Sequence, residues 1–289
     1  MLEEASSDDL VYVSEQGVWG HQEVLVYSYP QAKLVGELQP DTEETYEGLC
    51  SDSSGHVFVV GWITNGQAFY DEYAHGGSEP INDIIATGVP SGCSLDPSTG
   101  NLAVANYVDF NEGRHGDVAV YADAAGEPTD YSDATVPHYY FCAYDDKGNL
   151  FADGDSSVLN ELPKKSANMT SVYFNHNITP GSLQWNDGDL AVAVVGGAKG
   201  PTRIDRVTVA GSGAQIVGTT NLVSYHNEGT YLDVQFWIQG TRIIGPAPNA
   251  AGPTHALNFW PYPAGGKAIK TVTAPSNGNF YGVAFSAAP

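Results

Sequence analysis

The sequence repeats one short pattern, and this repeat restricts the possible folds more than any other feature. The stretch "YEGLCSDSSGHVFVVGW" at residues 46–62 returns as "VPSGCSLDPSTGNLAVANY" at residues 89–107. Each copy joins a short apolar strand to a second one through a polar turn that contains Asp and Gly. Related turn-and-strand elements are "DKGNLFAD", "NDGDLAVA" and "IQGTRIIG". Repeats of this kind are typical of solenoids and propellers.

Each copy continues into two further strands joined by a turn that bears Gly or Pro, as in "DVAVYADAAGEPTDYS". Six four-stranded units at a spacing of roughly 40 to 50 residues match the blade period of a β-propeller. We therefore expect one all-β domain over residues 1–289. The expected units are residues 46–90, 91–137, 138–179, 180–229, 230–278, and 279–289 together with 9–45.

The last of these units combines the two ends of the chain. The final strand, "FYGVAFS", has no follower, and the first strands have no predecessor. A six-bladed propeller in which the N-terminal and C-terminal strands pair would explain both observations. The 33 Gly, 17 Pro and 17 Tyr fit such an all-β chain, with little helix expected.

Acidic residues far outnumber basic ones. The chain has 34 Asp and Glu against 11 Lys and Arg, a formal net charge of -23. This charge repels phosphate backbones and anionic lipids, so nucleic acids and membrane surfaces are poor partners. We expect a small neutral or cationic molecule or a saccharide-like ligand, with a protein partner as the alternative.

No apolar run reaches the roughly 18 residues that a membrane-spanning helix needs. The first residues, "MLEEASSDDL", lack the basic and apolar regions of a signal peptide. The low share of charged residues, 16%, and the abundance of polar and Tyr residues favour an exported protein. We expect an extracytoplasmic or secreted protein whose signal peptide is absent from this chain.

The loops at one end of the predicted blades are long and rich in His and aromatic residues. We call this end the top face; its loops include residues 15–22, 61–67, 106–117 and 133–141. Propellers usually bind ligands where side chains of several blades converge. The predicted ligand-binding residues at this mouth are Glu15, Trp19, Trp62, Tyr107, Tyr140 and Tyr281.

A glycine-led inner strand, an Asp-x-x-Gly turn and the strand "NLAVAN" resemble the NHL-type and regucalcin/gluconolactonase-like six-bladed propellers. The resemblance covers nearly the whole chain. In the lactonases, a Glu at the head of an inner strand and Asn or Asp residues at strand ends hold a divalent cation. The resemblance implies Glu47, Asn106 and Asp153 as ligands of Ca²⁺ or another divalent cation. Asp153 lies one residue earlier than in the family, and Val194 replaces a further ligand.

Three histidines offer a different metal site. His138, His176 and His226 are predicted near the axis, where imidazoles from different blades would suit Zn²⁺ or Cu²⁺. No His-x-His or His-x₃-His spacing accompanies them. In a hydrolase, His138 or Asp153 would act as the general base. No motif for an organic cofactor is present.

Cys93 and Cys142 occupy equivalent positions in their inner strands, whereas Cys50 is offset by one residue and should face the other way. We expect inner strands of neighbouring blades to splay beyond the roughly 7 Å between Cα atoms that a disulfide tolerates. The sequence therefore predicts three buried free thiols.

Together these features predict an exported propeller that binds a small ligand in a central pocket of the top face, with or without a divalent cation. The first alternative is a metal-dependent hydrolase of the lactonase or esterase type. The second is a non-catalytic surface or protein-interaction scaffold.

Overall fold

A computed structural model describes residues 7–16, 22–38, 44–63, 66–109, 115–155, 158–176, 178, 180–194, 203–223, 235–249, 252–275 and 278–289. Within these residues, the regular structure is β-sheet apart from the 3₁₀ turn η2 (Ala122–Ala124) and the 3₁₀ residue Ser7. None of the described segments forms a helix long and apolar enough to cross a bilayer.

The strands form four sheets of four strands and one of nine. The first sheet, in the order β25-β1-β2-β3, consists of β25 (Asn279–Ser286), β1 (Leu10–Gln16), β2 (Gln22–Ser28) and β3 (Leu34–Leu38). The second consists of β4 (Glu44–Ser51), β5 (Val57–Ile63), β6 (Gln67–Tyr73) and β7 (Pro80–Thr87). The third consists of β8 (Val89–Leu95), β9 (Leu102–Val108), β10 (Asp117–Tyr121) and β11 (Thr129–Tyr131). The fourth consists of β20 (Trp237–Gln239), β21 (Arg242–Asn249), β22 (Gly252–Pro261) and β24 (Lys270–Thr273).

The nine-stranded sheet runs in the order β12-β13-β14-β15-β19-β18-β17-β16, and β23 (Gly266–Lys267) pairs with β19. Its first half consists of β12 (Tyr139–Tyr144), β13 (Leu150–Gly154), β14 (Val158–Leu162) and β15 (Thr170–Phe174). Its second half consists of β16 (Pro180–Asn186), β17 (Asp189–Val194), β18 (Arg203–Ala210) and β19 (Gly213–Val223). Among the described residues, the two halves are joined by a short parallel pairing, Tyr173 with Gly213 and Phe174 with Ala214.

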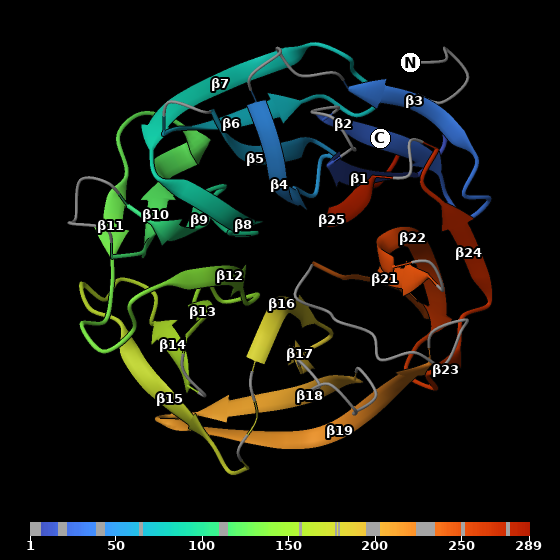
Figure 1. The fold of residues 1–289 in the computed structure, drawn as a ribbon. Helices are drawn as coiled ribbons and strands as arrows, with labels where there is room; N and C mark the ends of the chain where they lie inside the picture. Colours follow the sequence, from blue (N-terminus) through green and yellow to red (C-terminus); the bar gives the residue numbers. More distant parts are fainter. Residues whose placement is uncertain are drawn as a thin grey trace.

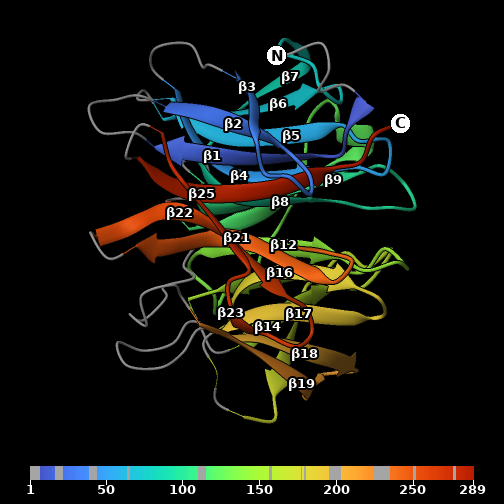
Figure 2. The ribbon, with the colours of Figure 1, turned by 90° about the vertical axis from the view of Figure 1, so that its right-hand side faces the viewer.

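The sheets surround a common centre, as in a β-propeller (Figure 1). The innermost strands β25, β4, β8, β12 and β16 lie nearest the axis, and β3, β7, β11 and β24 lie at the periphery. Going round the axis, β25 contacts β4, β4 contacts β8, β8 contacts β12, β12 contacts β16, β16 contacts β20, and β20 contacts β25. A side view shows β25, β4 and β8 crossing the molecule beside one another (Figure 2).

The sequence predicted six separate four-stranded units, and the sheets follow this prediction only in part. Four blades are separate, whereas the remaining strands form one continuous sheet. The difference arises because the outer edge strand β15 pairs with β19, a contact between distant segments that repeat spacing does not reveal.

The pairing of the two chain ends agrees with the prediction. β25 pairs with β1 in antiparallel register, from Leu10 opposite Ser286 to Gln16 opposite Asn279. The last strand of the chain thus supplies the innermost strand of the sheet that contains the first three strands.

Strands near the axis, such as β1 next to the innermost β25, are buried on both faces because each blade packs between two others. In β1, Leu10 and Tyr12 contribute to one core cluster, whereas Val11 and Val13 contribute to another. Successive side chains of a strand point to opposite faces, so such a strand needs apolar residues at every position. This requirement explains the continuous run "LVYV".

The prediction of three free thiols is wrong, because Cys50 and Cys93 form a disulfide with 5.6 Å between their Cα atoms. The inner strands β4 and β8 do not splay at this level. A Cβ added to Gly48 would lie 2.6 Å from the Cα of Gly92 and 2.5 Å from a β8 carbonyl oxygen. Glycines therefore let the two backbones approach until the neighbouring cysteines meet. Cys142 remains a buried free thiol, as predicted.

Candidate functional site

Three predicted site residues lie together near the inner strand β4. The Glu47 carboxylate accepts hydrogen bonds from Trp62 Nε1 at 3.2 Å and from Gln16 Nε2 at 3.2 Å. Tyr281 precedes Gly282, where an added Cβ would lie 2.5 Å from the Glu47 carbonyl oxygen. Burial raises the pKa of Tyr281, and the Glu47 charge raises it further. Glu47 and Trp62 were predicted from their positions at strand ends, and the sheet register brings these ends together.

The Glu47 carboxyl group has a pKa well above that of an ordinary glutamate. Burial raises its pKa to about 7, and the hydrogen bonds from Trp62 and Gln16 offset only part of this effect. Near neutral pH this carboxyl is therefore partly protonated and partly ionised. It is an acceptor for a cation or a hydrogen-bond donor on a ligand, or a carrier of one proton.

The raised pKa of Glu47 predicts a pH-dependent contribution to stability. An unfolded chain leaves this carboxyl near its ordinary pKa of 4.5, so the folded protein binds the proton more tightly. Its favourable contribution is complete below 4.5 and is lost as the pH rises through about 7. Replacing Glu47 with Gln keeps the acceptor for Trp62 and removes the charge. We expect the urea midpoint of Glu47→Gln, relative to that of the native protein, to increase between about pH 5 and pH 8.

The matched control is Glu79→Gln, because Glu79 is an exposed acid just before β7. Its midpoint should follow that of the native protein at every pH. A difference between Glu47→Gln and the native protein that stays constant across this range would contradict the assignment.

Glu15 and Asp153 are buried and hold backbone in place. The Glu15 carboxylate accepts the N–H of Gly278 at 2.9 Å, just before β25. Asp153 Oδ1 accepts the N–H of Phe141 at 2.6 Å. Phe141 lies within the register shift of β12 between Tyr139 and Cys142, and the Asp153 side chain supplies the acceptor for its N–H. Burial raises the pKa of Asp153 well above its ordinary value.

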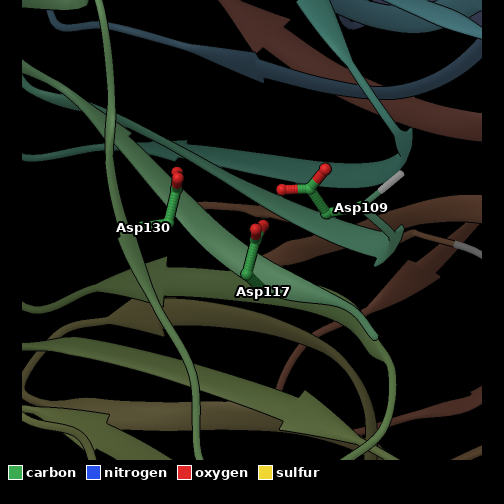
Figure 3. Close-up of side chains that lie close together, drawn as sticks. All are labelled: Asp109, Asp117 and Asp130. Atoms are coloured by element: carbon green, nitrogen blue, oxygen red, sulfur yellow. The ribbon is translucent and has the colours of Figure 1, made fainter. Parts of the chain in front are cut away.

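Asn106 lies in a different environment from Glu47 and Asp153. Its Nδ2 donates to Asp117 Oδ1 at 2.7 Å, and both residues are buried. Asp117 belongs to a group of carboxylates with Asp109 and Asp130 (Figure 3). Our sequence reasoning missed these three aspartates. The available signal was the hairpin register, since a tight β9–β10 pairing places Asp117 directly opposite Asn106.

Four residues from two neighbouring sheets form what we call the aromatic–acid cluster: Tyr107, His138, Tyr140 and Asp155. The rings of Tyr107 and His138 stack with centroids 4.3 Å apart, and Tyr140 lies 5.5 Å from Tyr107. Tyr140 Oη donates to Asp155 Oδ1 at 2.5 Å, and His138 Nδ1 pairs with Asp155 Oδ2. Tyr107 is 37% exposed, so one aromatic surface of the cluster reaches solvent.

The electrostatics of this cluster favour an ionised Asp155. Partial burial alone would raise its pKa, but the hydrogen bonds from Tyr140 and His138 lower the pKa below its ordinary value. Burial raises the pKa of Tyr140, and the neighbouring Asp155 raises it further. The cluster therefore presents aromatic rings next to a fixed negative charge. Asp155 orients the imidazole of His138 through Nδ1.

Of the remaining predicted residues, His176 does not join these groups. His176 is exposed, and its Nδ1 pairs with Asn175 Oδ1 at 2.9 Å. Trp19 and His226 lie outside the described residues. Among the described residues, Glu47, Asn106 and Asp153 each bond to different partners, so the structure does not assemble them as one site.

Comparison with protein-family profiles finds no match, and comparison with curated proteins finds no significant match. Similar solved structures do exist. A chain of a nidogen/laminin complex has a TM-score of 0.70 at 13% identity, covering 96% of this chain and 99% of that chain. A Bacteroides caccae protein of unknown function has a TM-score of 0.67 at 14% identity, covering 97% and 99%.

The β-propeller domain of Myceliophteria thermophila Cps50 (Swd1) has a TM-score of 0.57 at 12% identity, covering 94% of this chain and 85% of that chain. At these identities the similarity shows the fold alone, which is an all-β propeller. Propellers serve many unrelated functions, so the fold is compatible with a ligand-binding or protein-interaction scaffold without selecting either.

Proposed function

We propose that this chain is an exported propeller that binds a small ligand at the aromatic–acid cluster. The observation that carries the proposal is the partly exposed stack of Tyr107 on His138 beside the Asp155 carboxylate. Aromatic faces attract cations and the apolar faces of sugars, and a fixed carboxylate accepts ammonium or hydroxyl hydrogens. We therefore expect a small organic cation or a saccharide-like ligand. The formal net charge of -23 favours the cation.

We further infer that the propeller has six blades. The innermost strands contact one another in a closed cycle of β25, β4, β8, β12, β16 and β20. Each half of the nine-stranded sheet is a four-stranded antiparallel unit with one of these strands at its inner edge. Two blades joined along their outer edges would account for this sheet. The Cys50–Cys93 disulfide supports export, because disulfides persist mainly in oxidising compartments.

The test compares Tyr107→Ala with Tyr173→Ala. Tyr173 on β15 is 59% exposed and lies outside the cluster, so its replacement removes an exposed tyrosine of equal size. The probes are choline, as a quaternary ammonium ion, and a panel of oligosaccharides, measured by isothermal titration calorimetry. We expect one probe class to bind the native protein and Tyr173→Ala equally. Tyr107→Ala should weaken its affinity about tenfold, which corresponds to about 1.4 kcal/mol.

Equal binding to Tyr107→Ala and the native protein would place the site elsewhere, and no binding of either class would contradict the small-ligand proposal. The same proteins should also be incubated with lactones and esters. His138 held through Nδ1 by Asp155 has the arrangement of a general base. Turnover that is lost in His138→Gln would therefore replace binding by hydrolysis as the function.

A further inference from the structure

A group of acidic side chains lies on three neighbouring strands of one sheet. Asp109 directly follows β9, Asp117 begins β10, and Asp130 lies on β11 (Figure 3). In the register, Asp117 faces Asn106, and Asp130 faces Ala119. Because side chains two residues apart point to the same face, Asn106, Asp117 and Asp130 all project from one face of the sheet.

The distances within the group suit a single ion. One carboxylate oxygen from each of Asp109, Asp117 and Asp130 lies within 4.8 Å of the others. Two oxygens bound to the same Ca²⁺ at about 2.3 to 2.6 Å can be at most about 5 Å apart. The three aspartates therefore need little rearrangement to share an ion.

These residues line a cavity of about 410 Å³ between two sheets. Its opposite wall comes from β6 and β7 and includes Gln67 and Ile84. The small side chain of Ala119, opposite Asp130 in the register, also lines the cavity. A cavity of this size has room for an ion that keeps several water ligands.

The acceptors in this cavity exceed the donors. Asn106 and Asp117 are each 2% exposed. The amide orientation of Asn106 is fixed because Nδ2 donates to Asp117 Oδ1, and this leaves Asn106 Oδ1 buried without a hydrogen-bond donor. Asp117 Oδ2 is also buried without a donor. A buried acceptor without a partner is unfavourable, and a bound cation would satisfy it.

The negative charge around the cavity favours the binding of a cation. None of the described residues that line it is Lys, Arg or His, whereas four are acidic: Asp109, Asp117, Glu127 and Asp130. Carboxylates this close together repel one another in the absence of positive charge.

We infer that Asp109, Asp117, Asp130 and the side-chain oxygen of Asn106 form a Ca²⁺ site between the second and third sheets. Carboxylate and amide oxygens are hard ligands, and the absence of nitrogen or sulfur among the four argues against Zn²⁺ or Cu²⁺. Ca²⁺ tolerates irregular geometry, whereas Mg²⁺ demands a near-ideal octahedron. The site uses Asn106, a ligand expected from the sequence, but with partners other than Glu47 and Asp153.

The test is a calcium titration of chelator-treated native protein by isothermal titration calorimetry, with Mg²⁺ titrated in parallel. We expect saturable binding of one Ca²⁺ per chain and a rise in the thermal midpoint. Asp130→Asn should weaken the Ca²⁺ affinity tenfold or more because it removes one charged ligand. Asp117→Asn should weaken it at least as much. Asp83→Asn makes the same chemical change at an exposed acid on β7 and should bind Ca²⁺ like the native protein.

Asp130 is exposed, so Asp130→Asn should fold even if Asp117→Asn does not. The inference is overturned if the native protein shows no saturable Ca²⁺ binding at millimolar concentrations. It is also overturned if Asp130→Asn keeps the native affinity, since the ion would then bind elsewhere. Preference for Mg²⁺ over Ca²⁺ would refute the calcium assignment.

Discussion

Removal of residues 279–289 is expected to leave a chain that does not fold. These residues include β25, whose Phe280, Val283 and Phe285 are buried in one core cluster and whose Ala284 is buried in another. Burying a large apolar side chain contributes about 1.5 to 3 kcal/mol, so the three large residues together contribute roughly 5 to 9 kcal/mol. This range is comparable with the whole free energy of unfolding of a typical domain, about 5 to 15 kcal/mol.

The truncation also removes every hydrogen bond between β25 and β1 and exposes the edge of β1. We expect loss of cooperative unfolding in circular dichroism and aggregation in size-exclusion chromatography. A shorter truncation, which removes only residues 287–289, keeps all of β25 and should behave like the native protein. A peptide with the sequence of residues 278–289 should restore folding of the longer truncation when added in trans. A longer truncation that stays monomeric and unfolds cooperatively would show that β25 is dispensable.

This closure was predictable from the sequence because it depends on a local pattern. The strand "FYGVAFS" has the composition of the other inner strands, and its missing follower stands at the N-terminus. β25 and β1 pair accordingly. The positions of Glu47 and Trp62 at strand ends followed from the same repeat, and the register places their side chains within hydrogen-bond distance.

Contacts between units could not be predicted in the same way. The pairing of Tyr173 with Gly213, which fuses two units into one sheet, depends on how far the outer strands extend. The Asp109, Asp117 and Asp130 group requires the exact register of β9, β10 and β11, because a shift of one residue would turn an aspartate to the other face. The pairing of His138 with Asp155, which lies just after β13, likewise depends on contacts that the repeat pattern does not indicate.

The Cys50–Cys93 disulfide was mispredicted for a physical reason that concerns backbone distance. Counting positions along each strand correctly marks both cysteines as inner-strand residues, but the distance between β4 and β8 depends on the side chains that separate them. Gly48 and Gly92 provide no Cβ at the point of contact, so the backbones come closer than two ordinary strands of neighbouring blades would. A glycine at the same place in two successive repeats is the signal that would have indicated this approach.

We expect the double variant Cys50→Ser/Cys93→Ser to be less stable than the native protein by about 4 kcal/mol. The disulfide links positions 43 residues apart, and closing a loop of this length in the unfolded chain accounts for about 4 kcal/mol in the chain-entropy model. Guanidinium unfolding without reductant measures the difference. The control is Cys142→Ser, which changes the remaining cysteine, a buried residue outside the disulfide. With reductant present, the stability of the native protein should fall to about that of the double variant. Cys142→Ser keeps the disulfide, so reduction should lower its stability by a similar amount.

A thiol count decides whether the disulfide forms. Denatured, unreduced protein should react with a thiol reagent at one cysteine, Cys142, and at all three cysteines after reduction. Three reactive thiols without reduction would contradict the disulfide, and equal stability of the double variant and native protein would remove its structural role. The bond joins β4 to β8, one step around the axis from the contact between β25 and β4. Because β25 packs against β4 and the disulfide joins β4 to β8, loss of either should make these inner strands separate more easily.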